Sequence, residues 1–123
     1  MPAKTKFYED PSFLQLCPER RVEWEKRDEQ LVTLIVPKFK SEFTVKWLVP
    51  MLAKPNFKVK LETNGSFVWL QCDGQTTIET IVQRMHERTG DSIESLRERV
   101  GSFIAKLEKD GFLSLSKALQ LNS

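Results

Sequence analysis

The side chains best able to do chemistry in this sequence are one histidine and two cysteines. His86 has no second histidine or cysteine at metal-ligand spacing on its predicted helix, so we expect it at the surface or at its boundary. Cys17 and Cys72 lack CxxC spacing, which predicts two free thiols in a reducing cytoplasm. The sequence contains no GxxxxGK, GxGxxG, GxSxG or HExxH pattern. We therefore predict no enzyme activity, no metal and no cofactor.

Size and composition fit a single soluble domain. The chain has 123 residues, 40% hydrophobic and 29% charged, with a formal net charge of +2. That charge is too small to indicate nucleic acid by itself. No apolar run approaches the roughly 20 residues of a membrane helix, and no signal-peptide pattern opens the chain. We expect a cytoplasmic protein without a transmembrane segment.

Three segments have strand patterns. Residues 21–25 alternate between apolar and charged side chains, and residues 31–36 are β-branched and almost entirely apolar. These two segments predict an antiparallel hairpin. Residues 58–61 alternate again and predict a third strand, which a long connection leaves free to lie at a sheet edge.

Helical patterns follow the third strand. A short helix is expected around residues 67–70, and capped helices over 76–89 and 91–110, with Thr76 and Asp91 as the predicted N-caps and Gly90 as a left-handed C-cap. Gly101 lies inside the last helix, where glycine costs about 1 kcal/mol of helix stability relative to alanine. Either the long helix tolerates this cost, or the glycine lets another backbone approach the helix closely. One buried cluster is predicted from these helices: Phe67, Leu70, Ile78, Ile81, Val82, Leu96, Val100, Phe103 and Leu107.

Two segments are harder to interpret. Prolines make residues 1–20 an irregular N-terminal arm, and its aromatic side chains serve either as a packing strap or as a partner site. Residues 38–56 form an insertion between the second and third strands. Its helical spacing of Phe43, Trp47 and Met51 predicts either a short amphipathic helix or a basic aromatic surface for a membrane or acidic partner. We expect the domain proper over 21–115 and a tail over 116–123.

This order of elements predicts an α+β, winged-helix-like fold: a three-stranded antiparallel sheet followed by three helices. Such a fold suits either DNA binding through the last helix or peptide binding at the sheet edge. DNA binding is the weaker interpretation because the last helix has mixed charge. Its charged residues include Glu94, Glu98 and Glu108 beside Arg97, Arg99 and Lys106.

A series of short motifs between Leu61 and Leu113 points to one family. They are Leu61, Gly65, Phe67, Trp69, Cys72-Asp73-Gly74, the run Thr76 to Ile81, and the run Phe103 to Phe112. This ordered combination resembles the PqqD-like proteins, named for a component of pyrroloquinoline quinone (PQQ) biosynthesis. The resemblance implies a module that binds the leader of a ribosomal precursor peptide and presents it to a modifying enzyme, often a radical SAM enzyme.

The resemblance also implies a site. The leader would add as a strand beside the third strand and rest on the last helix, which corresponds here to Phe57, Lys58, Val59, Lys60, Leu61, Arg97, Gly101 and Ile104. Lys58 and Lys60 either meet acidic residues of the leader or protect the edge from aggregation. The alternatives are a winged-helix DNA-binding regulator and an adaptor of the same fold that binds no peptide.

Overall fold

The computed structural model of the protein describes residues 6–37 and 56–117. It confirms the α+β class, with a three-stranded antiparallel sheet and four α-helices in these ranges. The chain divides into two compact units, residues 22–66 and residues 1–21 with 67–123. The helix predicted for the insertion at 38–56 lies outside the described residues, apart from Asn56.

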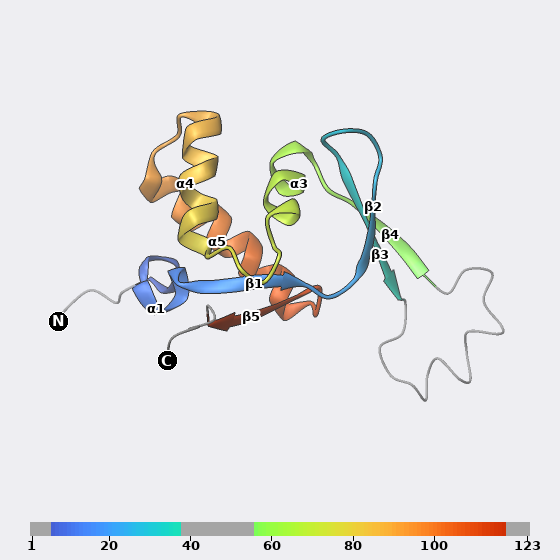
Figure 1. Ribbon diagram of the computed structural model, residues 1–123, viewed down its shortest axis with the longest axis horizontal. Helices are drawn as coiled ribbons and strands as arrows, with labels where there is room; N and C mark the ends of the chain where they lie inside the picture. Colours follow the sequence, from blue (N-terminus) through green and yellow to red (C-terminus); the bar gives the residue numbers. More distant parts are fainter. Residues whose placement is uncertain (1–5, 38–55, 118–123) are drawn as a thin grey trace. The chain divides into compact units, whose positions relative to one another are not determined.

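The unit of residues 22–66 contains the three-stranded sheet, whose strands are labelled β2, β3 and β4 in Figure 1. Its strands are β2 (Glu23–Lys26), β3 (Val32–Pro37) and β4 (Asn56–Lys60), in the order β2-β3-β4 with antiparallel neighbours. The predicted hairpin and third strand are therefore confirmed. The apolar run of β3 explains its central position, because Val32, Leu34 and Val36 are all buried.

Two polar side chains hold the end of β4. Arg27, in the hairpin loop, donates from Nη1 to the Val32 carbonyl at 2.8 Å and from Nη2 to the Leu61 carbonyl at 2.7 Å. The buried hydroxyl of Ser66 accepts the Val32 N–H at 2.9 Å. These bonds hold the backbone groups of Val32 and Leu61 at the end of the β3–β4 pairing.

The other unit is mainly helical. Helices α4 (Ile78–Thr89) and α5 (Ile93–Lys109) pack together, and α3 (Thr63–Leu70) ends in this unit. Its N-terminal part forms the 3₁₀ helix η1 (Phe7–Glu9) and the short helix α1 (Pro11–Leu14). Both η1 and α1 pack on the helices, with η1 against α5 and α1 against α4.

A second sheet was not predicted. Strand β1 (Leu16–Arg20) pairs antiparallel with β5 (Leu113–Lys117), and the two run side by side in Figure 1. The interpretation of residues 1–20 as irregular was therefore wrong for this strand. Pro18 is compatible with this strand because its carbonyl accepts the Gly74 N–H, so its backbone groups face away from β5. The alternation of Leu113, Ser114 and Leu115 is typical of a strand such as β5.

The helix caps lie one residue later than predicted. Thr77, not Thr76, is the N-cap of α4 and accepts the Thr80 N–H at 3.1 Å. Ser92, not Asp91, caps α5. Each predicted cap has another partner, because Thr76 bonds to Asp73 and the Asp91 carboxylate pairs with Arg99 at 2.7 Å. Gly90 has φ +79°, which confirms the left-handed C-cap.

The predicted core is partly wrong in helix phase. Phe67, Leu70 and Phe103 are only half-buried, while the other six predicted positions are buried. Their places are taken by neighbours one residue along, Val68, Trp69 and Ile104. The Phe67 ring instead lies beneath the Arg88 guanidinium, 4.7 Å from its ring centre, as a partly exposed cation–π pair.

Candidate functional site

The outer edge of β4 is the first part of the candidate site. Strand β4 pairs with β3 on one side only, and no other strand within 6–37 and 56–117 pairs with its outer side. An edge strand presents N–H and C=O groups that an added strand satisfies. The position predicted for a docking strand is therefore an edge in the described sheet.

The hydrogen bonds of β4 show which backbone groups face outward. The Leu61 N–H donates to the Val32 carbonyl at 2.9 Å, and the register places Val59 opposite Leu34 and Phe57 opposite Val36. Hydrogen-bonded and non-hydrogen-bonded pairs alternate along an antiparallel ladder. Val59 and Phe57 therefore direct their backbone groups toward β3. The N–H and C=O groups of Lys58 and Lys60 face away from the sheet.

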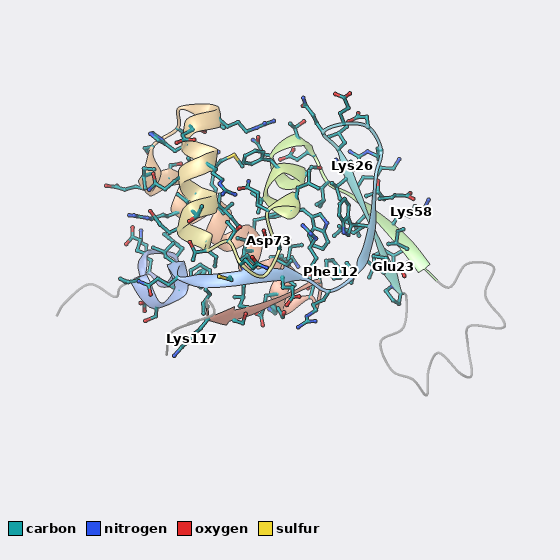
Figure 2. The ribbon with its side chains drawn as sticks, in the orientation of Figure 1. Glu23, Lys26, Lys58, Asp73, Phe112 and Lys117 are labelled. Atoms are coloured by element: carbon teal, nitrogen blue, oxygen red, sulfur yellow. The ribbon has the colours of Figure 1, made fainter. Side chains whose placement is uncertain are left out.

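The side chains of β4 divide between two faces. Lys58 and Lys60 share one face and are both exposed, whereas Phe57 and Val59 share the other. Phe57 is 43% exposed, which is unusual for an aromatic side chain, and Val59 is half-buried. Figure 2 labels Lys58 on the sheet. The strand thus offers a cationic face and an apolar face beside its free backbone edge.

Leu61 has a supporting position. Its side chain is buried, its N–H bonds to Val32, and its carbonyl accepts from Arg27. It comes directly after the last strand residue, Lys60. Leu61 therefore anchors the end of β4 and does not present free groups to a partner.

The predicted residues on α5 lie in the other compact unit. Arg97 donates from Nε and Nη2 to the two carboxylate oxygens of Glu79, both at 3.0 Å. This bidentate pair joins α5 to α4. The Arg97 hydrogen bonds hold the pKa of Glu79 below its ordinary value of 4.5, and Glu79 in turn raises the pKa of Arg97.

Gly101 is buried beneath the N-terminal segment of the chain. A Cβ placed on it lies 2.7 Å from the Tyr8 Cβ, 3.3 Å from Phe13 Cε2 and 3.6 Å from the Tyr8 Cα. The backbone that approaches this glycine in the structure is thus the chain's own. Ile104, one turn further along α5, is fully buried. A partner therefore contacts these two residues only after the side chains that cover them have moved.

The sequence signal for this contact was available but not connected. The sequence shows an aromatic-rich arm and a glycine inside a helix, and the contact between them joins residues far apart in the chain. Phe7 stacks edge-on against both Tyr8 and Phe13, with ring centres 5.2 Å apart in each case. The arm therefore acts as a packing strap in the described structure. No local pattern indicates which helix such a strap covers.

The Cys72-Asp73-Gly74 motif has a structural role. The Asp73 carboxylate accepts the N–H groups of Gln75 and Thr76, both at 2.9 Å, and these bonds lower the pKa of Asp73. Gly74 has φ +79°, which favours glycine, and its N–H donates to the Pro18 carbonyl at 2.9 Å. The motif shapes the turn between α3 and α4 and attaches it to β1.

The chemically reactive side chains do not gather into a site. Cys17 and Cys72 are free, buried thiols, and burial raises the pKa of Cys72 to about 12. His86 Nδ1 lies 2.6 Å from the Asp91 carbonyl. In the described ranges, no group of three or more histidine, cysteine or acidic residues is placed to hold a metal ion. No described helix is long and apolar enough to cross a membrane.

Comparison with known proteins finds similarity to one family. Residues 55–113 match the sequence model of coenzyme PQQ synthesis protein D (PqqD). The matched region runs from the start of β4 through α3, α4 and α5 to the start of β5. This match supports the assignment of the region to the PqqD-like family. A search of curated proteins found no match to the chain.

Proposed function

We propose that this chain is a peptide-binding module of ribosomal-peptide or PQQ biosynthesis. A leader segment of a precursor peptide adds as a strand to the outer edge of β4. The observation that carries the proposal is the outward direction of the Lys58 and Lys60 backbone groups, on a strand with one strand neighbour in the described sheet. Backbone pairing supplies affinity, and the flanking side chains supply specificity.

The family assignment supports this role. PqqD takes its description from coenzyme PQQ synthesis, and its family members act as accessory or binding proteins. We assign no catalytic step to this chain and propose that it presents the bound peptide to a separate modifying enzyme. A winged-helix-like arrangement of sheet and helices is part of the same proposal.

Arg97, Gly101 and Ile104 are a second proposed contact. They would meet the peptide in a form of the protein in which Tyr8 and Phe13 no longer cover Gly101. Pairing with β4 does not require this contact. A variant of β4 therefore tests the strand contact without testing the helix face.

DNA binding gains no support from α5. Arg97 is paired with Glu79 at 3.0 Å, and Arg99 is paired with Asp91 at 2.7 Å. Both guanidinium groups are thus already partnered by carboxylates. A recognition helix needs cations that are available to phosphates and base edges.

Affinity capture from the native host tests the proposal. The full chain serves as bait beside a Lys58→Pro variant, which lacks one outward N–H, and a Lys58→Ala variant, which keeps it. We expect a small precursor peptide with the parent and with Lys58→Ala, and a strongly reduced amount with Lys58→Pro. Equal recovery of the same peptide by all three proteins would place its binding site away from β4.

A further inference from the structure

The outward edge of β4 combines two side-chain faces with different chemistry. Side chains in a strand alternate between faces with a period of two, and a strand added to an edge continues the same two faces. On one face the added strand meets the exposed ammonium groups of Lys58 and Lys60. On the other it meets Phe57, which is 43% exposed, and the half-buried Val59.

Resting on the proposed strand addition, we infer the chemical class of the partner: an extended peptide with acidic residues at alternate positions. Two carboxylates separated by one residue lie on the cationic face, opposite Lys58 and Lys60. The residues between and beside them are apolar and lie against Phe57 and Val59. Opposite charges on directly opposed strand positions stabilise a sheet, and like charges destabilise it.

The charges of the chain disfavour two other strands that could pair with this edge. A second copy pairing through its own β4 would bring the lysine face of one strand against the lysines of the other. The chain's own segment 38–55 carries four lysines, Lys38, Lys40, Lys46 and Lys54, against one acid, Glu42. Like charge opposes both pairings, so a separate acidic segment fits the edge better.

Two acids of β2, Glu23 and Glu25, share the sheet face of Lys58 and Lys60 according to the register. Glu25 on β2 forms an ion pair with Lys58 at 3.5 Å, with both side chains more than half exposed. An exposed ion pair of this kind contributes little to stability, so Lys58 can exchange Glu25 for a carboxylate of a partner. No ion pair of Lys60 is found in the described parts of the chain. Lys60 is therefore the more available of the two for a carboxylate of the partner.

Four synthetic peptides test the inference with the full-length protein. The acidic probe is Ser-Val-Glu-Val-Glu-Val-Ser, which reads the same in both directions and so suits parallel or antiparallel pairing. Ser-Val-Val-Glu-Glu-Val-Ser has the same composition but places its acids on opposite faces. Versions with glutamine or lysine in place of both acids complete the set. Binding is followed by the amide chemical shifts of β4 in NMR titrations.

We expect the alternating acidic probe to bind about tenfold more tightly than the glutamine version, as two exposed ion pairs allow, and more tightly than the same-composition control. Its advantage shrinks as salt rises. The double variant Lys58→Glu, Lys60→Glu reverses the preference toward the lysine peptide. Lys26→Glu, a matched change on the opposite edge strand β2, leaves the preference unchanged.

The outcomes separate this inference from the proposed function. Equal binding of the acidic and glutamine probes at β4 overturns the acidic specificity and leaves strand addition standing. Equal binding of the two acidic peptides assigns the effect to net charge and overturns the alternating register. Absence of any shift at β4 with all four peptides overturns the inference as well, while the capture experiment decides the proposed function independently.

Discussion

The Leu61 N–H donates to the Val32 carbonyl at 2.9 Å, and this bond shows which backbone groups of β4 face β3. With the observed register, it follows that the backbone N–H and C=O groups of Val59 face β3 and that those of Lys58 face the outer edge of β4. Two adjacent residues of one strand thus have opposite roles. One holds the sheet together, and the other offers groups to a partner.

Proline substitution distinguishes these roles in the folded protein. Val59→Pro removes an N–H that bonds to β3, so it should lower the free energy of unfolding by more than about 1 kcal/mol. Lys58→Pro removes an outward N–H and should cost clearly less. Chemical denaturation of the two variants measures the difference. A larger loss for Lys58→Pro would show that the assigned ladder is out of register by one residue.

Gly101 should tolerate no side chain while the N-terminal segment covers it. Gly101→Ala improves helix propensity by about 1 kcal/mol but places a methyl group 2.7 Å from the Tyr8 Cβ, so we expect net destabilisation. Tyr8→Gly removes that Cβ and should restore tolerance. A double-mutant cycle measured by thermal unfolding gives the coupling. Additive effects of the two changes would argue against the contact.

Burial in α5 predicts unequal costs for neighbouring residues. Ile104→Ala removes a fully buried side chain and should cost about 2–5 kcal/mol. Phe103→Ala removes a larger but half-buried side chain and should cost less. Urea unfolding of both variants checks the order. A greater loss at Phe103 would favour the helix phase expected from the sequence alone.

The Glu79–Arg97 pair should make stability depend on acid pH. The pKa of Glu79 is below its ordinary 4.5 in the folded protein, so its contribution is present above that pH and is lost as the pH falls toward the lowered pKa. Glu79→Gln should cost about 0.5–1 kcal/mol near neutral pH, for a pair whose side chains are 32% and 30% exposed. The difference in free energy of unfolding between Glu79→Gln and the parent should become smaller below about pH 4.5.

Unfolding measured across pH checks this prediction. Glu108→Gln serves as the control, because Glu108 is an exposed residue of α5, the helix that contains Arg97. Its effect should stay small at every pH. A Glu79→Gln gap that does not change with pH would show that the pair contributes through packing alone.

Local patterns were sufficient for the hairpin and the long helices. Strands β2 and β3 are neighbours in sequence, and their alternation and apolar run identify them. The pairing of Leu16 with Lys117 joins the two ends of the chain, so no local pattern predicts it. The helix phase of α3 was ambiguous because Phe67, Val68, Trp69 and Leu70 are all apolar.

For the candidate site, the sequence predicts which side chains share a face of the strand but not which backbone groups face outward. Alternation in the sequence shows that Lys58 and Lys60 share a face, but it does not show whether their N–H groups face β3 or the free edge. That direction depends on the register with β3, a strand distant in sequence. The neighbour of Gly101 likewise depends on a contact with Tyr8 that spans most of the chain.

The central claim is that a peptide pairs with the outward backbone edge of β4. The most direct measurement compares Lys58→Pro with Lys58→Ala in titration calorimetry against the peptide captured from the host. Both variants lack the ammonium group, and only the proline lacks the outward N–H. The account predicts that Lys58→Ala retains most of the affinity and that Lys58→Pro loses at least about tenfold more. Equal affinities in two folded variants would contradict it.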